Sequence, residues 1–344
     1  MIGGGFSVRK PKVGIVGATG AVGVEVLKIL EERNFPVGEL FLFASARSEG
    51  KDVQFEGEKI TIHEAKSAAF EGIDIVFFAA GGGTSKKLAP EAVRHGAVVV
   101  DKSAAWRMDP SVPLVIPEVK GEDIHGHNGI ISSPNCSTIV MLMALAPLHR
   151  VNSIKRIIVD TYQSASGAGG KGIIELTEQT QGIMTGKEVS HSVFPHILAF
   201  NVLPHVEDFA DDDYTTEEIK MQNETRKILH APNLPVSATC VRVPVPISHS
   251  EAVHIEFEHP FTPAEARHVL SEAAGVIVQD DVASNIYPLA TEASGKDEIF
   301  VGRIRRDLAL ENGLSIWTVG DNLRKGAALN AVQIAEELIC ESSQ

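Results

Sequence analysis

The stretch "VGIVGATGAVG", residues 13–23, joins a short apolar run to a longer amphipathic one. Its glycines Gly17, Gly20 and Gly23 follow the spacing G-x-x-G-x-x-G. Glycines so placed let the backbone approach a pyrophosphate at a helix N-terminus, where unpaired N–H groups and the helix dipole favour anions. The alternative is a tight turn that only packs a helix on a strand. Because a strand is expected before the stretch and a helix after it, we predict a nucleotide-binding loop.

The first half of the chain continues this alternation of strands and helices. Short apolar runs indicate buried strands, and apolar residues at helical spacing indicate amphipathic helices. Their alternation predicts a parallel, doubly wound sheet, which is an α/β, Rossmann-like fold. The expected strands are residues 12–17, 39–45, 74–82 and 97–103, and the expected helices are residues 21–34 and 84–96.

The second half has longer strands and a different order of elements. Its pattern predicts a second, mixed α/β domain with a mostly antiparallel sheet covered by helices. The runs at residues 238–245 and 251–258 are expected to be neighbouring antiparallel strands. Further strands are expected at residues 154–166 and 314–322, and helices near residues 170–184, 215–229, 262–273 and 323–339.

This change of pattern divides the chain into two predicted domains. A length of 344 residues is sufficient for two domains with large cores. Residues 1–136 plus 323–344 are expected to form the nucleotide-binding domain, which the C-terminal helix completes. Residues 137–322 are expected to form a catalytic and dimerising domain.

The composition narrows the class of protein. A net charge of −14 argues against a nucleic-acid-binding face, and no apolar run approaches the length of a membrane span. Three cysteines without CxxC spacing do not fit a disulfide framework or a structural zinc site, so no metal is expected. Since the N-terminal residues have no apolar signal core, we expect a cytoplasmic protein, or one in an organelle such as the plastid if a transit peptide was removed.

The end of the second expected strand indicates which nucleotide is bound. A carboxylate there would bind a ribose 2′-hydroxyl, as in NAD enzymes. The stretch "ASARSEGK", residues 44–51, instead offers Ser45, Arg47 and Ser48. A guanidinium with hydroxyl groups suits a 2′-phosphate, so NADP is favoured. The alternative is that Arg47 is only a surface charge.

The stretch "SSPNCSTIV", residues 132–140, places Cys136 before an apolar run that is expected to be a helix. The backbone N–H groups at a helix N-terminus stabilise a thiolate. A lone cysteine is more often a buried apolar residue, and both interpretations are open from this stretch alone.

Two further clusters favour catalysis. The stretch "TYQSASGAGGKG", residues 161–172, can place Gln163 beside a reacting centre. Arg242 lies on an expected strand and His249 in the turn that follows. Arginine binds a carboxylate with two hydrogen bonds, and histidine exchanges a proton near neutral pH. A thiol, an imidazole and a nicotinamide together suggest oxidation or reduction through a thioester.

The chain resembles the aspartate-β-semialdehyde dehydrogenase family, in its bacterial and plant type. The matching motifs run in family order over nearly the whole chain, and "SPNCST" with the segment from arginine to histidine is highly specific. They are "GATGAVG" (17–23), "SPNCST" (133–138), "YQSASGAG" (162–169), "AFNVLPHVEDF" (199–209), "KMQNETRKIL" (220–229), "CVRVPV" (240–245), "SHSE" (248–251) and "VGDNLRKGAALNAVQIAE" (319–336).

The resemblance implies an activity and a fold. It implies NADPH-dependent reductive dephosphorylation of L-aspartyl-4-phosphate to L-aspartate-4-semialdehyde, in the pathway to lysine, threonine, methionine and isoleucine. It also implies a glyceraldehyde-phosphate-dehydrogenase-like catalytic domain, and a homodimer or dimer of dimers in which the middle sheets face each other.

The resemblance also implies a role for each matching residue. Cys136 would be the nucleophile, His249 the acid/base group, and Gln163 the residue that orients the acyl intermediate. The substrate α-carboxylate would bind Arg242 and its ammonium Glu217, with phosphate held by Asn135, Arg107 and Lys220. The cofactor would contact Gly17, Thr19, Gly20, Ala21, Val22, Gly23, Ser45, Arg47, Ser48, Gly81, Ser166, Gly167 and Asn322.

Two positions depart from the family pattern. Lys102 stands where an uncharged polar residue is usual, and Lys171 lies in the loop after residue 168.

The nearest alternative is N-acetyl-γ-glutamyl-phosphate reductase, whose cysteine has a different context. A catalytically inactive NADP-binding paralogue would be expected to lack Cys136 or His249, and both are present. A glyceraldehyde-phosphate-type dehydrogenase is excluded, because the residues around its cysteine and its cofactor-selecting residue both differ from those of this chain.

Overall fold

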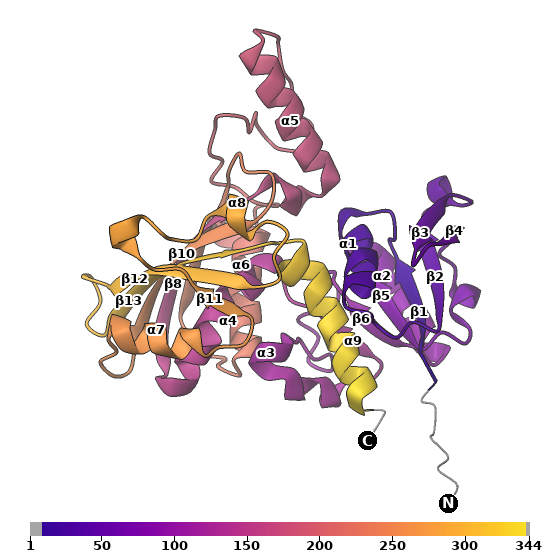
Figure 1. The fold of residues 1–344 in the computed structure, drawn as a ribbon, viewed down its shortest axis with the longest axis horizontal. Coiled ribbons are helices and arrows are strands. Elements are labelled where there is room, and N and C mark those ends of the chain that lie inside the picture. Colours follow the sequence, from indigo (N-terminus) through magenta and orange to yellow (C-terminus); the bar gives the residue numbers. More distant parts are fainter. Residues whose placement is uncertain (1–8, 342–344) are drawn as a thin grey trace, which may run out of the picture. The chain divides into compact units, whose positions relative to one another are not determined.

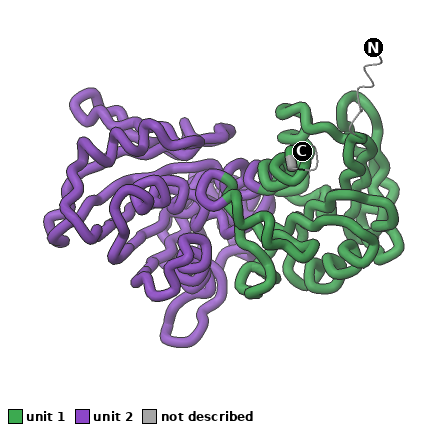
Figure 2. Tube along the Cα trace, turned by 90° about the horizontal axis from the view of Figure 1, so that it is seen from below, with its two compact units in different colours: residues 1–117, 121–133, 331–344 green, residues 118–120, 134–330 purple. Residues whose placement is uncertain are grey.

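The computed structural model describes residues 9–341 and divides into two compact units. Unit 1 comprises Met1–Pro117, Gly121–Ser133 and Ala331–Gln344. Unit 2 comprises Glu118–Lys120 and Pro134–Asn330, as coloured in Figure 2. The sequence predicts domain limits at residues 136 and 322. These limits stay a prediction, because the two units are defined by compactness and not by independent folding.

Unit 1 is built on a seven-stranded sheet in the order β3-β4-β2-β1-β5-β6-β7. All its neighbouring strands are parallel except β3 and β4. This confirms the Rossmann-like α/β fold. The strands are β1 (Lys12–Val16), β2 (Glu39–Ala44), β3 (Asp52–Phe55), β4 (Glu58–Glu64), β5 (Ile75–Phe78), β6 (Val98–Asp101) and β7 (Ile130–Ser132).

The helices of unit 1 follow the strands as a doubly wound fold requires (Figure 1). They include α1 (Ala21–Glu32) after β1 and α2 (Gly82–Arg94) after β5. The C-terminal helix α9 (Leu329–Glu341) belongs mainly to this unit, where Glu336 forms an ion pair with Arg33 at the end of α1. Short helical segments are η1 (Ala46–Ser48), η2 (Ser67–Phe70) and η3 (Gly121–Gly126). Helix α3 (Pro117–Lys120) begins in unit 1, and its other residues belong to unit 2.

Unit 2 is built on a six-stranded sheet in the order β11-β12-β13-β10-β8-β9. Helix α4 contacts β8, β10, β12 and β13, with α6 and α7 packed beside it, so these helices cover one face of the sheet. The strands are β8 (Ile154–Gln163), β9 (Val236–Arg242), β10 (His249–Phe257), β11 (Val276–Val278), β12 (Ile299–Arg306) and β13 (Gly313–Gly320). The helices are α4 (Cys136–Val151), η4 (Ala165–Ala168), α5 (Gly170–Met184), η5 (Asp211–Asp213), α6 (Thr216–Ile228), α7 (Pro263–Ser271), η6 (Val282–Ser284), α8 (Ala290–Ala293) and η7 (Arg324–Ala328).

One predicted pairing in unit 2 is wrong. The strands expected at residues 238–245 and 251–258 are not neighbours, because β8 lies between them, parallel to β9 and antiparallel to β10. The segment 243–248 contains Pro244 and Pro246, which cannot donate to a hairpin ladder. It crosses the end of β8 instead, where Ala165 and Ser166 donate to carbonyls of Val245 and Pro246.

The predicted C-terminal helix, residues 323–339, is also not continuous. A π-helical turn, η7, precedes α9. The Lys325 side chain is 1% exposed, and its Nζ bonds Glu118 at 2.6 Å and Asn330 at 3.2 Å. Gly326 faces the first turn of α4, because a Cβ there would lie 3.1 Å from the Cβ of Cys136. The sequence period does not reveal this π turn, which is defined by contacts outside its own segment.

The glycine-rich turn of unit 1 needs two of its glycines for steric reasons. Gly17 has a φ of 91°, and a Cβ there would lie 2.7 Å from the carbonyl oxygen of Ala79. At Gly23 in α1, a Cβ would lie 2.2 Å from the carbonyl oxygen of Gly17. The turn therefore packs the start of α1 directly on the backbone that leaves β1.

We expect Gly23→Ala to destabilise unit 1 by about 3 kcal/mol, because the turn or the helix must shift to admit the methyl group. Gly83→Ala is the matched control, since nothing lies within 4 Å of a Cβ at Gly83 in α2. We expect that control to be neutral or stabilising by about 0.5 kcal/mol. Urea unfolding without nucleotide, with hydrogen exchange of the α1 amides, measures both. Equal stability of the two variants would contradict the packing argument.

Candidate active site

The strand register of unit 2 brings three polar side chains to one end of the sheet. Gln163, the last residue of β8, lies opposite Arg242, the last residue of β9. His249 begins β10, which runs antiparallel to β8, so its first residue meets the end of β8. All three are buried on the face that the helices cover. The predicted residues Gln163, Arg242 and His249 are therefore adjacent.

Cys136 is the first residue of α4, whose N-cap is Asn135. Its Sγ lies 3.3 Å from His249 Nε2 and 3.7 Å from Asn135 Oδ1. The backbone N–H groups of the first turn and the helix dipole favour a negative charge at this position. Position and partner therefore both favour the thiolate form of Cys136.

The hydrogen bonds of His249 define how its ring is protonated. The side chain is fully buried, and the backbone N–H of Ser164 donates to its Nδ1 at 3.1 Å. Because Nδ1 accepts this bond, the proton of the neutral ring lies on Nε2. The Nε2–H group therefore points at the sulfur of Cys136 as a donor.

Asn322 holds the segments around His249 together. Its Oδ1 accepts hydrogen bonds from the hydroxyls of Ser164 and Ser166 at 3.1 and 2.9 Å, and from the backbone N–H of Ser248 at 3.0 Å. Ser248 has a φ of 78°, an uncommon conformation for a non-glycine residue. Gly167 is needed here because a Cβ would lie 2.6 Å from Arg242 Nη1.

Glu217 in α6 is a buried carboxylate next to the thiol segment. Its Oε1 accepts hydrogen bonds from Asn135 Nδ2 at 2.7 Å and Gln163 Nε2 at 3.0 Å. Burial alone would raise the pKa of Glu217, but the charge of Lys220 and these hydrogen bonds outweigh it and hold the pKa below its usual range. Glu217 is therefore ionised at neutral pH, as a ligand for an ammonium group requires.

Lys220 lies one turn after Glu217 and is close to two carboxylates. Its Nζ is 3.5 Å from Glu217 and also pairs with Glu207. Glu207 was not predicted as a site residue, and it lies in the "AFNVLPHVEDF" stretch of residues 199–209. The sequence signal that could have identified Glu207 as a site residue was its charge within a motif that matches the family.

Several of these side chains line a cavity of about 530 Å³ in unit 2, whose wall does not include His249, Asn322 or Lys220. Phe194 and His205 line it and were also not predicted, since the sequence gives neither an obvious partner. The Phe194 ring lies over the guanidinium of Arg242, with 5.8 Å from Cζ to the ring centroid. The lining residues are Asn135, Cys136, Gln163, Gly167, Ala168, Ser192, Val193, Phe194, Pro195, His205, Val206, Glu207, Asp208, Glu217 and Arg242.

Arg107, the remaining predicted phosphate ligand, lies in unit 1. Its Nε donates to the carbonyl of Ser133 at 3.0 Å and its Nη2 to the carbonyl of Lys102 at 2.8 Å. Lys102, one of the two departures from the family pattern, is thus a backbone partner of Arg107. Lys171, the other departure, is exposed in the first turn of α5.

The predicted nucleotide loop lines a second cavity, of about 430 Å³, within unit 1. Gly17 and Ser45 contribute to its wall together with Lys87, which was not predicted. Thr19 and Gly20 are exposed at the start of α1, Ala21 and Val22 are half-buried in its first turn, and Gly81 is the exposed N-cap of α2. Arg47 and Ser48 lie in η1, directly after Ser45.

This arrangement fits a dinucleotide with a 2′-phosphate. The close packing at Gly17 leaves backbone rather than side chains at the helix N-terminus, where a pyrophosphate binds. The exposed Arg47 lies at the end of β2, where the selector residue of such folds is found.

Glu251, two residues after His249 on β10, has a different electrostatic state from Glu217. It is fully buried, and its Oε1 has no hydrogen-bond partner within residues 9–341. Thr318 Oγ1 lies 3.5 Å from its Oε2. Burial raises the pKa of Glu251 well above its usual range, and the charge of Glu217 adds to this. A protonated, neutral carboxyl group is the form that this site stabilises.

Residues 9–341 contain neither a candidate metal centre nor a candidate membrane span. Among residues 9–341, no group of three or more His, Cys, Asp or Glu side chains could hold a metal ion. In the same part of the chain, no helix is both long enough and apolar enough to cross a bilayer.

Comparison with known proteins identifies similar sequences over nearly the whole chain. Residues 12–127 match the model of the semialdehyde dehydrogenase NAD binding domain, and residues 145–325 match that of the semialdehyde dehydrogenase dimerisation domain. The aspartate-semialdehyde dehydrogenase of Aquifex aeolicus is 55% identical over 96% of this chain and 98% of its own. That of Bacillus subtilis is 49% identical over 95% of this chain and 96% of its own.

A solved structure has the same fold. The crystal structure of aspartate semialdehyde dehydrogenase II from Vibrio cholerae, complexed with ASA, matches with a TM-score of 0.94 and 44% identity. The match covers 96% of this chain and 99% of that one.

The state of Glu251 predicts a pH dependence of stability. A carboxyl group whose pKa is raised on folding stabilises the protein fully below its unfolded pKa, and this contribution is lost as pH rises toward the native pKa. Relative to Glu251→Gln, the protein should therefore lose stability above about pH 5, by at most about 1.4 kcal/mol per pH unit. Urea unfolding from pH 5 to 8 measures this difference.

The exposed Glu258, next to the end of the same strand, provides the matched control. Stability curves of Glu258→Gln and of the unchanged protein should run parallel over this pH range. If the Glu251→Gln curve ran parallel to them as well, the assignment of a neutral carboxyl group to Glu251 would be wrong.

Proposed function

The chain belongs to the aspartate-semialdehyde dehydrogenase family and carries out the NADPH-dependent conversion of L-aspartyl-4-phosphate to L-aspartate-4-semialdehyde, for which we propose that Cys136 is the nucleophile. The observation that carries this assignment is the 3.3 Å contact between Cys136 Sγ at the N-terminus of α4 and Nε2 of the buried His249.

In the first half of the reaction, the Cys136 thiolate attacks the acyl carbon of the substrate. Two features stabilise the thiolate beforehand, the first turn of α4 and the Nε2–H group of His249. The C–S bond forms, the bond from the acyl carbon to the phosphate oxygen breaks, and phosphate leaves with the electron pair. A thioester on Cys136 remains.

Arg242 and Glu217 orient the amino-acid part of the substrate. Arg242 is 6% exposed and borders the cavity, and it binds the α-carboxylate. Glu217, which is ionised, binds the α-ammonium group. Gln163 lies between them and donates to Glu217, so it can orient the acyl group relative to both.

Within unit 2, Asn135 and Lys220 bind the phosphate group, and Arg107 of unit 1 stays a predicted third ligand. Asn135 lines the cavity next to Cys136, and Lys220 carries the nearby positive charge. In the structure Lys220 is paired with Glu207, so an incoming phosphate shares this cation with a carboxylate.

In the second half of the reaction the thioester is reduced. The cofactor NADPH, when bound, supplies a hydride. His249 keeps its proton on Nε2, next to Cys136, and donates a hydrogen bond from it to the oxyanion of the resulting hemithioacetal, whose electron pair then re-forms the carbonyl bond. The C–S bond then breaks, the semialdehyde leaves, and the thiolate is restored. Ser166, Gly167 and Asn322 form the wall beside His249, where we place the nicotinamide end of the cofactor.

The alternatives are not favoured. The relatives compared above are aspartate-semialdehyde dehydrogenases, and not acetylglutamyl-phosphate reductases. A catalytically inactive paralogue would have no reason to keep Cys136, His249 and Asn322 in one connected network.

The assembly is a homodimer, or a dimer of dimers, with the sheets of unit 2 facing each other. A semialdehyde dehydrogenase dimerisation domain matches this part of the chain. The sheet face opposite α4 exposes Ile158 and Tyr162, and Tyr162 contacts Trp317 with ring centroids 5.3 Å apart. Sedimentation at micromolar concentration should give a dimer or larger species. A monomer alone would count against this assembly.

We place the enzyme in the cytoplasm. Its three cysteines, all within the described residues, form no disulfide, which fits a reducing compartment. Cell fractionation tests this location, and activity confined to an extracytoplasmic fraction would contradict it.

Cys136→Ala should abolish turnover, since no other thiol lies at the start of α4. The assay is reduction of NADP by semialdehyde and phosphate. NADP binding, measured by fluorescence titration, should be unchanged within about twofold. Cys240→Ser is the control, because Cys240 lies mid-strand in β9 and is not part of the cavity wall. Turnover by Cys136→Ala above one-hundredth of the original rate would rule out the thioester route.

Arg47→Ala should weaken NADP far more than NAD, because only NADP carries the 2′-phosphate that a guanidinium binds. We expect KM for NADP to rise by about tenfold to a hundredfold and KM for NAD to change by less than about twofold. Lys51→Ala, an exposed cation beyond the same turn, is the matched control. Equal losses for both cofactors would show that Arg47 does not contact the 2′-phosphate.

A further inference from the structure

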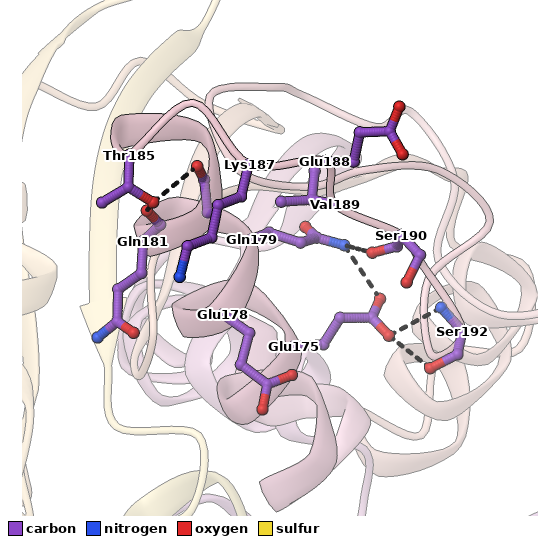
Figure 3. Close-up of a pocket in the computed structure, with 11 residues that line it drawn as sticks. Glu175, Glu178, Gln179, Gln181, Thr185, Lys187, Glu188, Val189, Ser190 and Ser192 are labelled. Atoms are coloured by element: carbon purple, nitrogen blue, oxygen red, sulfur yellow. Dashed lines mark hydrogen bonds between the residues drawn. The ribbon is translucent and has the colours of Figure 1, made fainter.

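Helix α5 and the loop after it form a polar network that none of the roles above uses. Glu175 lies on the inner side of α5 and is buried (Figure 3). Its Oε2 accepts hydrogen bonds from the backbone N–H and hydroxyl of Ser192, at 2.8 and 2.7 Å, and from the N–H of Val193 at 2.8 Å. Its Oε1 accepts one from the N–H of Phe194 at 3.2 Å. One carboxylate therefore holds three consecutive backbone amides.

Gln179, one turn later on α5, holds the next part of the same loop. Its Nε2 donates to the carbonyl of Ser190 at 2.9 Å, and its Oε1 accepts from Leu198 and Ala199 at 2.9 and 3.2 Å. Figure 3 shows Glu175 and Gln179 side by side, both directed at the loop. Glu178 on the same helix points away from this network. The loop is thus fixed by two neighbouring side chains of α5.

The loop carries Phe194 to Arg242. Phe194 is 5% exposed and packs in a cluster with Ala165, Leu176 and Leu198. Gly172 allows the close approach of α5, because a Cβ there would lie 3.1 Å from Phe194 Cζ. The guanidinium of Arg242 lies over the Phe194 ring, with Cζ 5.8 Å from the ring centroid, and Ser192 through Phe194 also line the substrate cavity.

The contact with the Phe194 ring changes how Arg242 binds an anion. Nη1 of Arg242 donates to the carbonyl of Ser164 at 2.7 Å, which fixes the plane of the guanidinium. The π face of an aromatic ring at this distance attracts the cation, and burial of Arg242 to 6% exposure keeps most water from it. A carboxylate then binds a guanidinium that is already oriented and partly dehydrated, so binding costs less side-chain entropy and less desolvation free energy.

We propose that Glu175 is a positioning residue for recognition of the substrate α-carboxylate, because it fixes residues 192–194 so that Phe194 covers and orients Arg242. This rests on the proposed role of Arg242 as the carboxylate ligand. Glu175 itself touches neither the substrate cavity nor the reacting atoms, since it is not part of the cavity wall.

The ionisation of Glu175 is consistent with this role. Burial alone would raise the pKa of Glu175, but the hydrogen bonds from Ser192, Val193 and Phe194 outweigh it and hold the pKa below its usual range. The carboxylate is therefore the acceptor of these bonds throughout the neutral pH range. A glutamine would direct an NH₂ group at amides that are themselves donors.

The test is Glu175→Gln assayed with semialdehyde, phosphate and NADP. We expect KM for the semialdehyde to rise by about tenfold, with kcat lowered less than about threefold, because the lost interaction acts on binding. KM for NADP and the rate of Cys136 alkylation by iodoacetamide should stay unchanged. A general loss of structure would change these two readouts as well.

Phe194→Leu keeps an apolar side chain at this position but removes the ring face, and it should give the same rise in KM. It also tests the proposal if Glu175→Gln does not fold. Glu178→Gln is the matched control, because this exposed residue lies on the same helix and outside the loop network. It should match the unchanged enzyme in every readout.

A double-mutant cycle separates this proposal from the role of Arg242. Arg242→Lys should raise KM for the semialdehyde, and adding Glu175→Gln to it should raise KM no further. If Arg242→Lys left KM unchanged, the assigned role of Arg242 would be wrong. If Arg242→Lys raised KM while Glu175→Gln and Phe194→Leu did not, or if the two effects multiplied, only the positioning role of Glu175 would be overturned.

Discussion

The site depends on the position of strand β8 between β9 and β10. Parallel pairing with β9 places Gln163 beside Arg242, and antiparallel pairing with β10 brings His249 to the same end. Had β9 and β10 formed a hairpin, β8 would have been displaced from between them. Its Ser164 would then not reach the ring of His249. The crossing of residues 243–248 over the end of β8 is therefore a condition for the chemistry as well as a feature of topology.

Buried charge in unit 2 is arranged in two ways. Glu217 and Glu175 are ionised because several N–H groups or a nearby lysine compensate for lost hydration. Glu251 has no such compensation and holds its proton. Near Cys136 the pattern therefore combines fixed negative charges with a neutral acid, and the thiolate is stabilised by the N-terminus of α4 and by His249. A further ionised carboxylate at Glu251 would work against that thiolate.

Much of the fold followed from local patterns. Apolar runs and helical periods gave the elements of unit 1 and most of unit 2, because burial imposes a period that does not depend on the partner. The pairing of β9 with β10 was mispredicted, since two adjacent strands can be neighbours or can flank a third with the same alternation. The π turn at Arg324–Ala328 was missed because the contact of Lys325 with Glu118 is remote in sequence.

The sequence by itself determined the glycine turn, the position of Cys136 before an apolar helix, and the residue types at Gln163, Arg242 and His249, because these depend on steric and chemical needs of single segments. Only the tertiary structure decided which nitrogen of His249 faces the sulfur, and which groups Glu175 and Phe194 contact. Such choices depend on distances of a few ångströms between segments far apart in the chain, and a linear pattern carries no information on those distances.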